Sequence, residues 1–78
     1  MKTVSEINET LKETTGVTIQ DLLLAQSEED AKKYCDQLGL TLVVTRRDDE
    51  ILNVVTNVNP SRLKVELDSG RITEVQVG

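Results

Sequence analysis

The chain has 78 residues, the size of one small domain, which we expect to span 1–78. Its 14 acidic residues outnumber the 9 basic ones, and the formal charge of −5 repels phosphate backbones, so we expect no nucleic-acid partner. Its apolar runs fall far short of the roughly 20 residues that a membrane span needs, and the first residues lack the apolar segment of a secretory signal. We therefore expect a cytoplasmic protein that does not bind membranes.

The composition also argues against catalysis. The chain contains no histidine, so it has neither an imidazole base nor an imidazole metal ligand. The single cysteine, Cys35, cannot form an internal disulfide, and its spacing on a predicted helix turns it toward the core. The four glycines are isolated and form no phosphate-binding loop. We expect no enzymatic activity, no catalytic residue, no metal site and no cofactor.

The first half of the chain carries signals for three helices. Apolar residues at spacings of three and four between Val4 and Leu11 predict a helix from Thr3 or Ser5 to about Thr14. Thr18 can cap a second, short helix. These two helices are expected to cover the core, and the alternative is an apolar patch for a partner or for self-association. Ser27 opens the clearest helix, since a capping hydroxyl and first-turn acids precede a closing Gly39.

The second half carries signals for strands. Residues 40–45 alternate between two faces, and residues 62–67 alternate charged and apolar side chains. The turn residues 68–70 lead to a returning strand over residues 71–77. The apolar parity changes across Thr73 and Glu74, which predicts either a bulge or a strand that crosses from one layer to another. This order predicts an α+β fold, with N-terminal helices followed by a small, mostly antiparallel sheet and one helix packed on it.

A polar connection separates the two predicted strands. Residues 46–50 are charged and are expected to form a solvated turn. The following residues combine β-branched side chains with Pro60, which fixes φ and favours an extended backbone at Asn59 before it. An exposed segment that is already extended loses less entropy on binding, so it can join a sheet edge or enter another protein's cleft. Binding to another protein is therefore the expected function.

Two stretches resemble a known family. The sequence SEEDAKKY, from Ser27, resembles the helix of plant potato inhibitor I-type serine protease inhibitors. The sequence NPSRLKVELDSGRITEVQVG, from Asn59, resembles the pattern of their bacterial relatives, with Pro, one residue, Arg, Leu, one residue and Val before an Asp turn, a hydrophobic strand and a closing Gly. The resemblance covers about residues 27–78 and implies an inhibitor-like core, with residues 1–26 as a helical extension.

The resemblance implies a binding site. In that family an exposed loop enters a serine protease like a substrate and is cleaved very slowly. By position the loop here is about residues 52–61, with Thr56 entering the specificity pocket and the bond between Thr56 and Asn57 as the scissile bond. The supporting residues would be Asn59, Arg62 and Gly78, with the Arg62 fork hydrogen-bonded to loop carbonyls. The protease-binding residues would be Val54, Val55, Thr56, Asn57 and Val58.

The chain departs from this family at three positions. Val55 stands where Thr is usual, Asn57 where an acid is usual, and Asn59 replaces the second supporting arginine. Because those groups brace the loop, the departures predict a looser loop that a protease can cut as a substrate.

Two other roles compete with inhibition. The first is a non-inhibitory protein interaction or regulatory module of the same fold, which binds its partner through the N-terminal helices or a strand edge. The second is sequence-specific nucleic-acid binding, which needs a basic stripe and is opposed by the interleaved acids. In each role we expect a monomer or a weak homo-oligomer.

Overall fold

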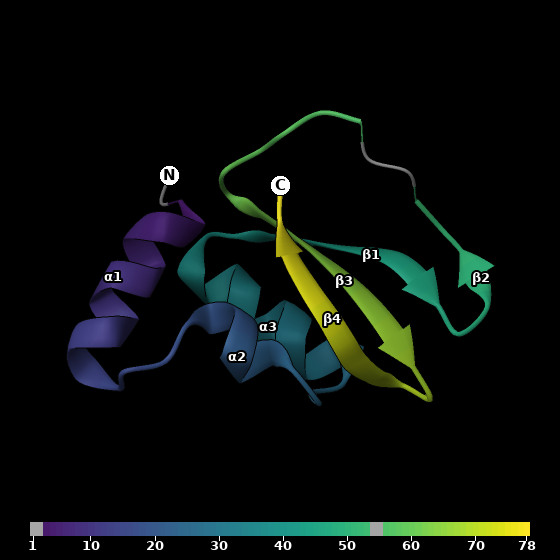
Figure 1. The fold of residues 1–78 in the computed structure, drawn as a ribbon, viewed down its shortest axis with the longest axis horizontal. Coiled ribbons are helices and arrows are strands. Elements are labelled where there is room, and N and C mark those ends of the chain that lie inside the picture. Colours follow the sequence, from purple (N-terminus) through teal and green to yellow (C-terminus); the bar gives the residue numbers. More distant parts are fainter. Residues whose placement is uncertain (1–2, 54–55) are drawn as a thin grey trace.

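The computed structural model describes residues 3–53 and 56–78 and places helices ahead of one four-stranded sheet (Figure 1). The predicted α+β fold is confirmed. No helix within the described ranges has the length and apolar composition that a membrane crossing requires. The elements are α1 (Val4–Thr14), α2 (Ile19–Leu23), α3 (Glu28–Leu38), β1 (Thr41–Arg47), β2 (Glu50–Ile51), β3 (Arg62–Asp68) and β4 (Arg71–Val77).

Helices α2 and α3 begin directly after the hydroxyl residues that the sequence predicted, and α1 begins after Thr3, one of its two predicted starts. The side-chain oxygens of Thr3, Thr18 and Ser27 each accept a hydrogen bond from the main-chain N–H three residues later. Such caps satisfy donors that have no acceptor inside the helix. At its other end α3 stops at Gly39, whose φ of 75° lies in the left-handed region. The predicted helix signals are thereby confirmed.

The sheet is mixed, with the order β2-β1-β3-β4. The outer pairs, β1 with β2 and β3 with β4, are antiparallel, whereas the central pair of β1 and β3 is parallel. The predicted bulge is present, because Glu66 pairs with Glu74 and Leu67 with Ile72, which leaves Thr73 as the extra residue.

The charged connection is shorter than the sequence predicted. β1 continues to Arg47, and only Asp48 and Asp49 form the turn before β2. Asp48 has a φ of 54°, and its side chain accepts a hydrogen bond of 2.9 Å from the Ser69 N–H. Pairing with β2, and the contact with the turn between β3 and β4, therefore extend β1 into a charged stretch whose sequence alone predicts a loop.

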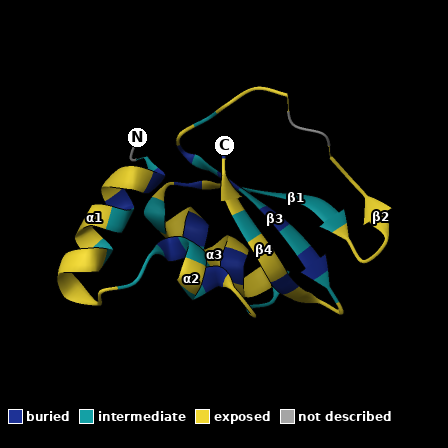
Figure 2. Ribbon diagram, in the orientation of Figure 1, coloured by how far each residue is buried: buried dark blue, intermediate teal, exposed yellow. Residues whose placement is uncertain are grey.

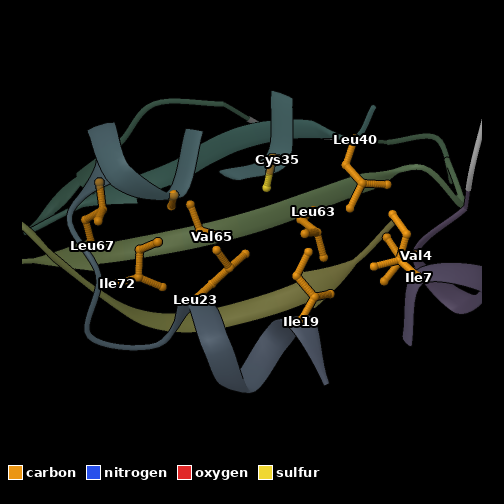
Figure 3. Packing of buried hydrophobic residues seen from close by; sticks show 11 residues of the cluster. Val4, Ile7, Ile19, Leu23, Cys35, Leu40, Leu63, Val65, Leu67 and Ile72 are labelled. Atoms are coloured by element: carbon orange, nitrogen blue, oxygen red, sulfur yellow. The ribbon is translucent and has the colours of Figure 1, made fainter. Parts of the chain in front are cut away.

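One hydrophobic core lies between the helices and a single face of the sheet (Figures 2 and 3). β3 buries every second residue, as its alternating pattern predicted. Two helices cover the sheet face, where the sequence predicted one, because α3 contacts β1 and α2 contacts β4. The core residues are Val4, Ile7, Ile19, Leu23, Ala31, Cys35, Leu40, Leu63, Val65, Leu67 and Ile72.

The first two helices belong to this core. Val4, Ile7, Ile19 and Leu23 are at most 5% exposed, and Ile19 and Leu23 point from α2 toward the sheet (Figure 3). The residue pattern predicted that these helices cover the core, and this is confirmed. The resemblance, in contrast, set residues 1–26 apart as an extension of an inhibitor-like core. The structure instead puts the described part of this segment into the same apolar cluster as β3, because α3 alone does not cover the sheet.

Candidate functional site

Residues 52–61 connect β2 to β3, and the last described part of this connection comes down beside the start of α1 (Figure 1). Thr56, Asn57 and Val58 are exposed, and Val58 keeps 88% of its surface accessible. Val54 and Val55, which the resemblance also assigns to the binding segment, lie outside the described residues. A β-branched, apolar side chain as exposed as Val58 makes few contacts within its own chain, so it is available to a partner.

The first limb of this loop is held along β1. The N–H of Leu52 donates to the Thr45 carbonyl at 3.0 Å. The side-chain amide of Asn53 donates to the Val44 carbonyl at 2.7 Å. These bonds continue the pairing of β1 with β2, so the limb stays on the sheet edge until Asn53.

The second limb is held by Arg62. Its Nη2 donates to the Asn57 carbonyl at 2.5 Å and to Asn57 Oδ1 at 3.2 Å. Its Nε donates to the main-chain oxygen of Gly78 at 2.9 Å, and Nη2 donates to the same oxygen. In return the Gly78 N–H donates to the Arg62 carbonyl at 3.1 Å. The planar fork of one guanidinium therefore joins the exposed loop to the end of β4.

The residues before Arg62 are tied to three different elements. The Asn59 N–H donates to the Gly78 oxygen at 3.3 Å, the Pro60 carbonyl accepts from the first N–H of α1 at 2.8 Å, and the Ser61 carbonyl accepts from the first N–H of β1 at 2.9 Å. The Asn59 side chain accepts from the Ser61 N–H at 2.9 Å, which is an Asx turn. Successive residues of this limb thus have fixed backbone partners in α1, β1 and the end of β4.

Neutral amides occupy the positions where the family has charged groups. Asn57 presents its side-chain oxygen to Arg62, so an amide takes the place of a carboxylate in that contact. Asn59 turns its side chain to the neighbouring Ser61 and supports the loop through its main chain. The charged Arg62 still makes a charge-assisted bond, but an amide lacks the attraction between opposite charges that a carboxylate would add, so the looser loop stays a prediction.

Sequence reasoning named Arg62, Asn59 and Gly78 as supports but missed two contacts of the loop. Asn53 was not singled out, although asparagine amides often bond to nearby backbone. The donor from α1 is a main-chain N–H, which has no signature in the sequence. Such a contact emerges only from the packing of α1 against the sheet.

The sheet face opposite the helices carries a second polar cluster. Arg46 Nη1 and Nη2 donate to the two carboxylate oxygens of Asp68, each at 3.0 Å, and Arg46 Nε donates to Glu66. These bonds raise the pKa of Arg46 and lower the pKa of Asp68. Glu74 lies directly across from Glu66, and a side-chain hydrogen bond between them raises the pKa of Glu74 and lowers that of Glu66.

This cluster borders an open hollow of about 360 Å³ on that face. Its lining mixes both signs of charge, including Arg46, Lys64, Glu66 and Glu74. Across residues 3–53 and 56–78, no group of three or more His, Cys, Asp or Glu side chains is placed to hold a metal ion. The hydrogen bonds of the cluster join β1, β3 and β4, which is a structural role.

Cys35 is fully buried between α3 and the sheet, as its helical spacing predicted. Burial, together with the charge of Asp36, raises the pKa of the thiol to about 11. The thiolate, which is the reactive form of cysteine, is therefore scarce at neutral pH. Tyr34, on the same helix, is half-buried against the rim of the core.

Comparison of the chain with protein-family models, with curated proteins and with solved structures finds no match. The likeness to potato inhibitor I-type proteins therefore rests on the sequence patterns quoted above. The geometry of the loop carries the functional argument.

Proposed function

We propose that this protein binds another protein through residues 52–61, and that the loop enters the cleft of a serine protease as an inhibitor does. The observation that carries the proposal is the position of Arg62, which holds Asn57 in the exposed segment and Gly78 at the end of β4. A segment whose two limbs are both hydrogen-bonded to the rest of the domain loses less conformational entropy on binding than a free loop does. It also resists the rearrangement that cleavage requires.

Position and side-chain shape suggest the class of protease. Thr56 is exposed within the loop and, by the resemblance, is the residue that enters the specificity pocket. Its small β-branched side chain suits a small or medium apolar pocket, as in elastase-like or subtilisin-like enzymes. A chymotrypsin-like enzyme, which accepts large aromatic side chains, is the natural negative comparison.

The proposal is tested by incubating the protein with one protease of each of these three classes. Residual protease activity and the intact mass of the protein are followed over time. Inhibition with slow or no cleavage between Thr56 and Asn57 supports the proposal, and it should disappear in Thr56→Pro. Rapid cleavage at that bond without inhibition would refute it and would agree with the looser loop that the neutral amides predict.

A pair of arginine variants tests the support of the loop. Arg62→Ala removes the hydrogen bonds to Asn57 and Gly78, and we expect inhibition to weaken and cleavage to accelerate by about 10- to 100-fold, the range for charge-assisted bonds. Arg71→Ala is the matched control, since Arg71 is exposed and its side chain has no bond or ion pair within the described part of the chain. Equal effects of the two substitutions would contradict a role for Arg62.

A second candidate is a non-inhibitory interaction through the open edge of β1. β2 pairs with Arg46 and Arg47, and Leu52 and Asn53 extend this contact along β1 as far as Val44. The neighbouring edge borders a hollow of about 420 Å³ lined by Leu42, Val43, Val44 and Leu52 among others. An extended segment of a partner can add to such an edge. A partner that still binds after Arg62→Ala and after cleavage of the loop favours the edge, and a partner lost with Arg62→Ala excludes it.

A further inference from the structure

Helix α1 contacts the loop through its first residue. The Val4 N–H donates to the Pro60 carbonyl at 2.8 Å. The first N–H groups of a helix have no acceptor within the helix, so each needs a partner elsewhere. Thr3 Oγ1 accepts from Glu6, whereas Val4 directs its donor out of the helix to the loop.

This donor stands on a fixed element. The Val4 side chain is 1% exposed and Ile7, one turn later, is 5% exposed, so the first turn of α1 is anchored in the core. Figure 3 places both side chains at the end of the core beside Leu40 and Leu63. A group held by core packing is a more precise support than one on a mobile side chain.

The acceptor, the Pro60 carbonyl, lies next to the exposed part of the loop. Pro60 follows Asn59, whose N–H bonds to the Gly78 oxygen, and Pro60 has no N–H of its own with which to pair. Its carbonyl is therefore the one main-chain hydrogen-bonding group through which Pro60 can be held, and it accepts from the Val4 N–H of α1. A shift of Pro60 would move Asn59 and the exposed residues before it.

We propose that the first turn of α1 is a positioning element for the loop. The docked helix holds Pro60, and through it the limb that carries Thr56 and Asn57. This inference rests on the proposed function and adds a means of regulation, because any event that detaches α1 from the core would turn the inhibitor into a protease substrate. The N-terminal helices would then control the loop without touching the protease.

The test removes the Val4 N–H and keeps every side chain. Chemical ligation at Cys35 allows the full chain to be assembled from two synthetic segments, so an ester can replace the amide between Thr3 and Val4. The matched control is an ester between Val4 and Ser5, because the Ser5 N–H has no partner in the described structure. Each ester also weakens one carbonyl acceptor of the same helical turn, and urea unfolding of both proteins corrects for any change in global stability.

Two readouts decide the outcome. We expect the Val4 ester to raise the hydrogen-exchange rate of the Asn59 and Ser61 amides, and the rate of cleavage between Thr56 and Asn57, by about fivefold relative to the Ser5 ester, the factor for one hydrogen bond. Equal exchange rates in the two esters would overturn the inference. Because exchange is measured without a protease, faster exchange in the Val4 ester supports the inference even if no protease is inhibited, a result that refutes only the proposed function.

Discussion

Leu23 provides the sharpest test of how the N-terminal helices contribute to the fold. Its side chain is 0% exposed and points from α2 into the core beside Val65 and Ile72 (Figure 3). Replacement of a buried Leu by Ala costs about 2–5 kcal/mol, from lost apolar burial and from the cavity left behind. A domain of this length has a total free energy of unfolding of about 4–12 kcal/mol. Leu23→Ala should therefore remove about a sixth of the stability or more.

The adjacent residue supplies the control. Leu24 ends α2 and is 43% exposed, so Leu24→Ala removes the same atoms from a site that solvent already reaches. We expect a loss below about 1 kcal/mol. Both variants are unfolded in urea and followed by circular dichroism, with unchanged slopes as the check on two-state behaviour. Equal losses, or a loss below about 1 kcal/mol for Leu23→Ala, would refute the placement of α2 in the core.

Three further predictions concern two carboxylates and the thiol. The bond to Arg46 lowers the pKa of Asp68 in the folded protein. The Asp68 carboxylate therefore stabilises the fold at pH values above its pKa in the unfolded chain, and this contribution is lost as the pH falls through its pKa in the folded protein. Asp68→Asn should destabilise the protein at neutral pH and not in strong acid. Glu66 raises the pKa of Glu74 in the folded protein. The protonated Glu74 side chain therefore stabilises the fold at pH values below its pKa in the unfolded chain, and this contribution is lost as the pH rises through its pKa in the folded protein. Because glutamine stays neutral, Glu74→Gln should stabilise the protein at neutral pH only. Urea unfolding at several pH values checks both signs, and pH-independent differences would contradict them. Cys35 should react with a thiol reagent only as fast as the chain opens, and urea-independent labelling would contradict its burial.

The local features of the fold could be predicted from the sequence. Thr3, Thr18 and Ser27 cap helices because a hydroxyl and the following N–H groups lie within a few residues of each other. The bulge at Thr73 follows from a change in the parity of apolar residues along one strand. Each of these signals is read from neighbours in the chain, so no knowledge of the rest of the fold is needed.

Long-range features could not be predicted in the same way. Alternation identifies β1 and β3 as strands but does not specify that they pair with each other, or that they do so in parallel. The resemblance set residues 1–26 apart as an extension and gave no sign that they share one apolar cluster with β3, because the sequence does not show how much sheet surface α3 leaves uncovered. In the site, Arg62 was found through a family pattern, whereas the contact from Val4 involves a backbone group that every residue except proline has.

The parallel pairing of β1 and β3 sets the path of the connection between them. The chain leaves β1 at Arg47 and must return along the sheet, about 20 Å, before β3 begins at Arg62. Each doubling of the length of a flexible connection costs only about 0.6 kcal/mol in closure entropy. With the limbs bonded at Asn53 and Asn59, the stretch between them can be rewritten or lengthened at little cost to the sheet. The fold is therefore suited to the insertion of other peptides in this loop. The inserted sequence would determine which protein is bound, and the sheet would determine the stability of the domain.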